Sequence, residues 1–400
     1  MKHQSAVGSG QSAGSRQWAA RVILLLLALV CSAGAAAAQK IEKKETYPGQ
    51  WLTSYYPFIA VLPNNGPSFE LRAQHWQMAP YEAPVTAAVL FRARAAWAPW
   101  GGSWLASIGM NAPLLRPGWR LMADIRAGSD TRYGFYGFGN TNDIDPGPTK
   151  ESEPFLYRVQ RNLYAATVDL TRTITGPLRA SVMLNGSIAD YSSLSPTSTF
   201  QQVVGSDLNQ SEGSVTGALV VDLRDNEYDT RKGLLAEAGG QFGISDNNYT
   251  RWYGIARGWM PATKTTVVAA RIFVSNMTGT PTLLAQQVLP GWESPYAVLG
   301  SEESHRAIPY GRFTGTGLLG TNFEVRQGII TKGEYGALGV VLFLDAGRSF
   351  ENDFKLTFDD WTVGGGGGLV VRILRGNVFI LTYGITKNES HVGFRTGWMF

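Results

Sequence analysis

Hydrophobic and polar residues alternate along most of this 400-residue chain, in runs that end at Gly, Pro, Asn or Asp. In the run 85–97, for example, Val85, Val89 and Trp97 share one face, while Arg92 and Arg94 lie on the other. A period of two residues is typical of a β-strand with one apolar and one polar face. The pattern predicts sixteen strands, at residues 51–62, 68–78, 85–97, 103–111, 119–136, 155–173, 178–191, 214–223, 234–244, 250–260, 265–277, 317–330, 337–346, 363–374, 377–386 and 390–400.

The number of strands and the lengths of their connections predict a transmembrane β-barrel. An antiparallel bacterial barrel has an even number of strands, with short periplasmic turns and longer external loops. If both ends of the chain are periplasmic, all the long connections fall outside and the short turns fall on the periplasmic side. The long connections are 137–154, 192–212, 278–316 and 347–362, and the short turns are 174–177, 261–264 and 375–376. The predicted fold is therefore all-β: a 16-stranded antiparallel transmembrane β-barrel.

The amino-terminal residues predict export from the cytoplasm. Residues 1–21 are polar and basic, residues 22–30 are apolar, and small residues follow up to Ala38. This is the pattern of a cleaved signal peptide, and the apolar run is shorter than the ~20 residues of a spanning helix. We expect a signal peptide at 1–38, a short periplasmic leader at 39–50, and a single barrel domain at 51–400. Cys31, the one cysteine, would be removed with the signal peptide.

The net charge does not indicate a nucleic-acid partner. The formal charge is +4, but the predicted signal peptide carries Lys2, Arg16 and Arg21 and no acidic residue. The mature chain would therefore be close to neutral, and we expect no binding to DNA or RNA.

One long connection and the two strands after it contain a candidate ion cluster. Arg306 and Arg312 flank a Pro-Tyr-Gly turn in the connection 278–316. Each of the next two predicted strands places one acid, Glu324 or Asp345, on the face opposite apolar residues. Loops of this length without secondary structure are uncommon and usually functional. We expect Arg306 to fold back between the two carboxylates and to act as a loop clamp; a gate or switch is the alternative role.

Several short motifs resemble the BamA/TamA family of outer-membrane barrels, also called the bacterial surface antigen family. The resemblance is clear over 213–400 and faint over 57–191. Its motif residues are Asp222, Arg224, Asp225, Asn226 and Gly233 after one strand, and Gly347 after Phe343-Leu-Asp-Ala. The final strand, with Trp398 and Phe400 at its end, is similar to the carboxy-terminal signal of bacterial outer-membrane barrels.

The resemblance implies a role for Arg306. The family's sixth external loop reads Val-Arg-Gly-Tyr/Phe, and its Arg folds into the barrel lumen to pair with acids on the wall. Here the corresponding residues are His305-Arg306-Ala307-Ile308, so Arg306 is kept while the Gly and the aromatic residue are replaced. Glu324 and Asp345 occupy the matching acidic positions. We therefore expect the long extracellular loop to fold into the lumen. The family's periplasmic POTRA domains, which receive unfolded clients, have no counterpart in this sequence.

The chain offers little for catalysis or metal binding. A G-x-S-x-G match at 10–14 lies in the predicted signal peptide, and a G-x-G-x-x-G match at 315–320 precedes a strand rather than a helix. His75, His305 and His391 are scattered, without the spacing of metal ligands. We expect no enzyme activity, no cofactor and no metal site. The favoured function is assistance in inserting or translocating proteins or lipids at the bacterial outer membrane, in contact with its lipid and with a separate periplasmic partner protein. The alternative is a passive pore or a structural barrel.

Overall fold

A computed structural model describes residues 49–62, 65–80, 82–140, 153–244, 248–332, 336–373 and 377–400. The predicted signal peptide and nearly all of the predicted leader lie outside the described residues, as do the turn at 375–376 and most of the connection 137–154. No helix in the described part of the chain is both long enough and apolar enough to cross a membrane.

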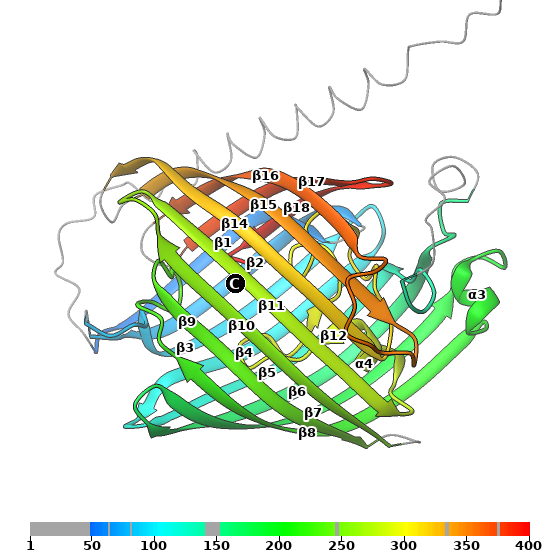
Figure 1. Cartoon of the computed structure of the whole chain (residues 1–400), viewed down its shortest axis with the longest axis horizontal. Helices are drawn as coiled ribbons and strands as arrows, with labels where there is room; N and C mark the ends of the chain where they lie inside the picture. The colour runs from blue at the N-terminus through cyan, green and yellow to red at the C-terminus, as the bar shows by residue number, and fades with distance from the viewer. Residues whose placement is uncertain are drawn as a thin grey trace, which may run out of the picture. The chain divides into compact units, whose positions relative to one another are not determined.

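Sixteen strands form one sheet in which each strand pairs with the next along the chain, and every pairing is antiparallel (Figure 1). The sixteen predicted strands of the sheet and their order are confirmed; two further short strands lie in the connection 278–316, where none was predicted. The strands are β1 (Trp51–Leu62), β2 (Gly66–Met78), β3 (Ala87–Ala98), β4 (Ser103–Arg116), β5 (Trp119–Gly134), β6 (Arg158–Thr175), β7 (Leu178–Ser193), β8 (Asp207–Asp222), β9 (Gly233–Ile244), β10 (Tyr249–Pro261), β11 (Thr266–Gly279), β14 (Gly317–Lys332), β15 (Gly336–Phe350), β16 (Thr362–Ile373), β17 (Asn377–Thr386) and β18 (Ser390–Thr396).

The connection between β11 and β14, residues 280–316, is the longest fully described one, and we call it the long segment. It contains the short helix α4 (Leu283–Gln287) and a small hairpin made of β12 (Val288–Leu289) and β13 (Ala297–Val298). A second short helix, α3 (Thr199–Val203), lies between β7 and β8.

The sheet buries its polar side chains and exposes its apolar ones, which is the opposite of the arrangement in a soluble protein. In β6, Thr167, Asp169 and Thr171 are buried on one face, whereas Val168 and Leu170 are exposed on the other. The same pattern recurs in β11, where Arg271 is buried and Ile272 is exposed. We call these the polar face and the apolar face. Strands that alternate in this way suit a sheet with lipid on one side and a polar interior on the other.

The two ends of the sheet come close through a contact between the second strand and the last. Among the described residues no hydrogen-bonded ladder joins β1 to β18. The guanidinium of Arg72, on β2, nevertheless donates a 3.0 Å hydrogen bond to the hydroxyl of Thr396, on β18. This contact requires the sheet to curve until its two ends are close together.

Several strand boundaries differ from the sequence prediction: β4, for example, ends at Arg116 rather than Asn111, and β15 at Phe350 rather than Ala346. β8 begins at Asp207 rather than Ser214, because the ladder with β7 continues through residues that, apart from Leu208, carry no apolar side chain and therefore show no hydrophobic alternation. β18 ends at Thr396 rather than Phe400. Gly397 has a φ of 86° and donates its backbone N–H to Val378, so the chain turns out of the ladder there.

The last residues then pack on the polar face of the sheet. Met399 and Phe400 are buried in an apolar cluster with Trp259 and Trp292, and the backbone oxygen of Phe400 accepts a 2.6 Å hydrogen bond from Arg326. The alternation of aromatic residues continues through Trp398 and Phe400, which is why the sequence pattern predicts a strand to the end.

Candidate functional site

The long segment packs against the polar face of the sheet through residues that lie far apart in the sequence. Trp292, which is 1% exposed, donates its ring N–H to Thr171 of β6 at 2.8 Å. Its backbone N–H donates to Glu237 of β9 at 3.1 Å. Tyr296 donates its hydroxyl to Asn185 of β7. The long segment therefore bridges strands from the first and second halves of the sheet.

Arg306 of the long segment lies between the two acids that the sequence singled out. Its guanidinium donates to Glu324 at 2.5 Å and to Asp345 at 2.8 and 2.9 Å, and its backbone N–H also donates to Asp345 at 2.8 Å. All three side chains are at most 4% exposed. We call Arg306, Glu324 and Asp345 the Arg306 cluster. The structure brings its three members together; their role as a clamp stays a prediction.

The register of β14 and β15 explains why the two acids converge. Asn322 lies directly opposite Asp345, and Glu324 follows Asn322 by two residues on the same face. Asn322 donates to Asp345 at 2.8 Å and to the carbonyl of Ser304 at 2.8 Å, so it also holds the long segment. Sequence reasoning missed Asn322, although its position two residues before Glu324 is the signal that could have found it.

The electrostatic environment keeps Arg306 charged. Burial alone would lower the pKa of Arg306, but Asp345 and Glu324 raise it above its ordinary value. Arg306 also lies over the ring of Phe343, 4.1 Å from the ring centroid. Glu324 in turn accepts a 2.5 Å hydrogen bond from Arg326. Buried charges are stable when they are paired and fully hydrogen-bonded, and this cluster meets that condition.

Small residues on β16 and β17 accommodate the residue after Arg306. Ala307 is fully buried, and its Cα lies 2.7 Å from the place that a Cβ on Gly384 would occupy. A Cβ on Gly364 would lie 2.4 Å from the methyl group of Ala307. The sheet therefore leaves room for Ala at this position because two neighbouring strands carry Gly. Ile308 is also fully buried, in an apolar cluster with Phe273 and Phe313.

The motif residues between β8 and β9 shape a turn and connect it to the long segment. Asp225 accepts backbone N–H groups of Arg231 and Lys232, and Asn226 accepts those of Tyr228 and Asp229. Gly233 has a φ of 128°, and a Cβ there would lie 2.2 Å from the carbonyl oxygen of Leu223, so only Gly fits.

Arg224 of this turn binds two acids. Its guanidinium lies 3.0 Å from Asp222 and 2.8 Å from Glu293 of the long segment. Burial by itself would raise the pKa of Glu293, but Arg224 and Arg257 lower it to about 2. Glu293 was not found from the sequence, since an irregular loop has no periodicity to indicate which side chains point inward.

The remaining motif residues lie close to these contacts. Gly347 is in β15, directly opposite Gly320, and a Cβ there would come within 3.7 Å of the ring of Phe313. Trp398 donates its ring N–H to Asp229 at 2.9 Å and stacks under Arg326, 4.0 Å from the ring centroid.

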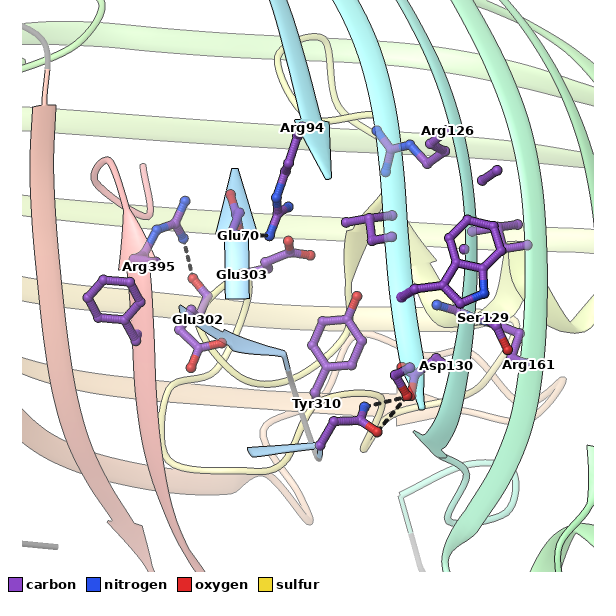
Figure 2. A pocket seen from close by; sticks show the side chains of 18 of the residues that line it. Glu70, Arg94, Arg126, Ser129, Asp130, Arg161, Glu302, Glu303, Tyr310 and Arg395 are labelled. Atoms are coloured by element: carbon purple, nitrogen blue, oxygen red, sulfur yellow. Dashed lines mark hydrogen bonds and ion pairs between the residues drawn. The ribbon is translucent and has the colours of Figure 1, made fainter. Parts of the chain in front are cut away.

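A charged cavity of about 290 Å³ lies beside the long segment (Figure 2). Figure 2 shows Glu302, Glu303 and Tyr310 of the long segment facing charged residues of β2, β3, β5 and β18. Arg94 donates to Glu70 at 2.7 Å, and Arg395 donates to the backbone oxygen of Glu302. Residues near both ends of the sheet therefore line one cavity.

One contact resembles a hydrolase triad in composition but not in geometry. Ser301 and Glu302 both lie within hydrogen-bond distance of His391, but both contact the same ring nitrogen, Nε2, at 2.8 and 3.2 Å. A triad needs the serine and the acid on opposite ring nitrogens. Ser301 is also fully buried. In the part of the chain that the structure describes, no group of three or more His, Cys, Asp or Glu residues is arranged to hold a metal ion.

The comparisons with known proteins agree with this architecture. Residues 112–376 match the model of the Omp85 superfamily domain. Among solved structures, BamA from Haemophilus ducreyi lacking POTRA domains 1-3 is 11% identical with a TM-score of 0.53, covering 87% of this chain and 70% of its own. CdiB from Escherichia coli is 10% identical with a TM-score of 0.54, covering 86% of this chain.

These structural likenesses, at such low identity, concern the fold. The chain spans 62% of the CdiB chain, less than two thirds. No curated protein matches the chain by sequence. The family match covers well over half of the chain, and the sheet and its alternation agree with it. This protein therefore belongs to the Omp85 superfamily and is an outer-membrane β-barrel protein of bacteria.

Proposed function

We propose that this protein assists the insertion or translocation of proteins or lipids at the bacterial outer membrane, without enzyme activity. In this proposal the sheet closes into a sixteen-stranded barrel, the long segment fills part of the lumen, and the seam between β1 and β18 is where a client strand engages. A separate periplasmic partner would deliver the client, and lipid would cover the apolar face.

Contacts between the two ends of the sheet support the closed barrel. The hydrogen bond from Arg72 to Thr396 spans the gap between β2 and β18. Residues of both strands also line the cavity of Figure 2 together. The polar face would then surround the lumen, and the exposed apolar residues, such as Ile125 and Leu342, would face lipid.

The unpaired edges at the seam carry the functional proposal. β1 is twelve residues long and β18 only seven, and no ladder joins them in the described part of the chain. A free strand edge exposes unpaired backbone N–H and C=O groups, which can pair with an added strand. In lipid such groups are costly when they stay unpaired. Pro57, which cannot donate a backbone hydrogen bond, lies in β1 as expected of an edge strand.

The long segment argues against a wide passive pore. It is tied to the polar face by the Arg306 cluster, by the ion pair of Glu293 with Arg257 of β10, and by the hydrogen bond of Trp292 to Thr171 of β6. A barrel whose interior is occupied in this way suits a protein that works at its seam better than one that conducts solutes through its centre.

Disulfide trapping tests the proposal. The variant Ser54→Cys places a thiol on β1, and Ser187→Cys places one on β7, which is paired on both sides. Each purified variant, without residues 1–38, would be refolded into liposomes and given an unfolded outer-membrane protein that carries one cysteine in its last strand. We expect cross-linking at position 54 at least about tenfold above that at position 187, which is a selectivity of about 1.4 kcal/mol.

Equal or absent cross-linking at the two positions would contradict the seam proposal. If the client also folded at the same rate in liposomes without the protein, the passive or structural barrel would be the better interpretation.

A further inference from the structure

Two arginines stand directly opposite each other on the polar face of the sheet. Arg257 of β10 and Arg271 of β11 are register partners, and they are 8% and 4% exposed. Like charges at directly opposed positions of an antiparallel pair repel each other. Repulsion between two buried guanidinium groups is stronger than between exposed ones, because little water screens it. The arrangement therefore calls for negative charge nearby.

Of the two arginines, only Arg257 has a carboxylate as its partner. Arg257 pairs with Glu293 at 2.6 Å. Arg271, by contrast, donates to two neutral oxygens, the side-chain amide of Asn322 at 2.8 Å and the backbone carbonyl of Glu303 at 3.0 Å. In the described part of the chain, no carboxylate lies within 4 Å of Arg271. Arg271 lies over the rings of Phe273 and Phe400, but a buried charge is normally paired with an opposite charge, and among the described residues Arg271 has no such anionic partner.

The charges around Arg271 are mostly positive. The charges that act most strongly on Arg271 are those of Arg257, Asp345, Arg306 and Arg395, and among these four only Asp345 is negative. Asp345 already accepts three hydrogen bonds from Arg306 and one from Asn322. The charge of Asp345 is therefore largely neutralised by Arg306 and offsets little of the charge of Arg271.

Arg257, Arg271 and Arg395 line one cavity of about 230 Å³, next to the long segment and residues 397–400. The acidic groups of this cavity already have partners. Glu227 pairs with Arg120, Glu293 pairs with Arg224 and Arg257, and Glu303 accepts the backbone N–H of Val298 and partly offsets the charge of Arg395. The main-chain oxygen of Phe400 accepts from Arg326.

The three arginines also keep unused donors. A guanidinium has five N–H donors. Arg271 and Arg395 each use two in the described contacts, and the Nε of Arg257 is buried without a partner. The cavity thus offers converging positive charge and free N–H groups in a space large enough for a small anion.

We propose that this cavity is a binding site for a phosphate-type oxyanion, with Arg271 as its main ligand and Arg257 and Arg395 beside it. Guanidinium groups bind phosphate through paired, charge-assisted hydrogen bonds. A tetrahedral oxyanion presents acceptors in several directions, which suits donors from three strands better than a planar carboxylate does. The anion would come from free phosphate or from the phosphate of a lipid headgroup. Arg395 lies on β18, but the site needs no strand pairing at the β1–β18 seam, so it does not rest on the proposed function.

Calorimetric titration with inorganic phosphate tests the site. Refolded protein in a zwitterionic detergent would be titrated at constant ionic strength, as wild type and as Arg271→Gln, Arg271→Lys and Arg251→Gln. Arg251 is the matched control, because it is also 4% exposed and donates to a backbone carbonyl, that of Ala285, but does not line this cavity.

We expect saturable binding by wild type and Arg251→Gln, and binding at least about tenfold weaker in Arg271→Gln, since a charge-assisted hydrogen bond contributes more than a neutral one. Arg271→Lys, which keeps the charge, should be intermediate and shows that a loss in Arg271→Gln does not come from failed folding. No binding by wild type, or equal affinity in Arg271→Gln, would overturn the proposal.

A second arm separates the two sources of phosphate. The titration would be repeated in nanodiscs of phosphatidylcholine with and without phosphatidic acid. If phosphatidic acid abolishes the binding of inorganic phosphate to wild type, the site takes a lipid phosphate. If phosphate binds equally well in both nanodiscs, the site takes the free anion.

Discussion

Arg306 donates three hydrogen bonds to the single carboxylate of Asp345, and one of the three comes from its own backbone N–H. Asp345 therefore fixes the path of the main chain at this position as well as the guanidinium. The neighbouring carboxylate cannot replace it, because Glu324 is shared with Arg326. The path of the long segment at Arg306 thus depends on one acid of β15.

The variant Asp345→Asn should destabilise the protein strongly. It keeps the shape of the side chain but leaves Arg306 buried with half of its counter-charge, and breaking a buried ion pair costs roughly 3–5 kcal/mol. Urea-induced unfolding of the refolded protein in detergent measures the effect. The control is Asp360→Asn, because Asp360 is 69% exposed and pairs with Arg348 at 3.3 Å; it should cost less than about 1 kcal/mol. Equal losses in the two variants would show that the Arg306 cluster adds no special stability.

The variant Arg306→Ala should change the electrical behaviour of the protein. Without Arg306, the long segment loses its ion pairs with Glu324 of β14 and Asp345 of β15 and can leave the interior of the proposed barrel. We expect small, flickering conductance for the wild type in a planar bilayer and a larger conductance for the variant. Arg116→Ala, at the end of β4 and outside these contacts, should behave as the wild type. A large, steady conductance that is the same in all three proteins would contradict the clamp and favour a passive pore.

The sequence could predict the sheet because its signal is repeated in every strand. Alternation of polar and apolar residues determines which face of a strand is buried, so the number of strands and their order follow from it. The prediction fails where the side chains on the two faces of a strand are both polar or both apolar. Residues 207–213 of β8 contain only one apolar side chain, that of Leu208, so they show no alternation. Trp398 and Phe400 are aromatic whether they continue the strand or pack on the polar face.

The candidate site could be predicted only in part. Glu324 and Asp345 stand out because each is an acid at a position within a strand, and a resemblance to a family indicated Arg306 as their partner. Glu293 and Trp292 make equally important contacts with the sheet, but they lie in an irregular segment. Only the three-dimensional path of the long segment brings them to Arg224 and Thr171. The opposed pair Arg257 and Arg271 likewise depends on the register between β10 and β11.

The variant Gly384→Ala should destabilise the protein, because Ala307, the residue after Arg306, packs against β17 where Gly384 has no side chain. An added Cβ would lie 2.7 Å from the Cα of Ala307 and 2.9 Å from the carbonyl oxygen of Arg306, so the long segment would have to move. Overpacking of this kind costs about 1–3 kcal/mol. Gly186→Ala in β7 is the matched control, since no atom lies within 4 Å of the Cβ it would add. The free energies of unfolding of the two variants should differ by at least about 1 kcal/mol; similar values would mean that the segment tolerates displacement.

The ion pair of Glu293 with Arg224 and Arg257 should make stability depend on pH in the acid range. The pKa of Glu293 is lowered from an ordinary value of 4.5 to about 2. A carboxyl group with a lowered pKa stabilises the folded protein fully above its unfolded pKa, and this contribution is lost as the pH falls towards the folded value. A shift of this size corresponds to about 3 kcal/mol at neutral pH.

Unfolding of the wild type and Glu293→Gln should therefore be compared in steps between pH 7 and pH 2. We expect the wild type to be the more stable protein above about pH 5, with the difference shrinking steadily as the pH approaches 2. Gln cannot titrate, so groups common to both proteins cancel in the comparison. A difference that stays constant over this range would show that Glu293 is not held as an ion by Arg224 and Arg257.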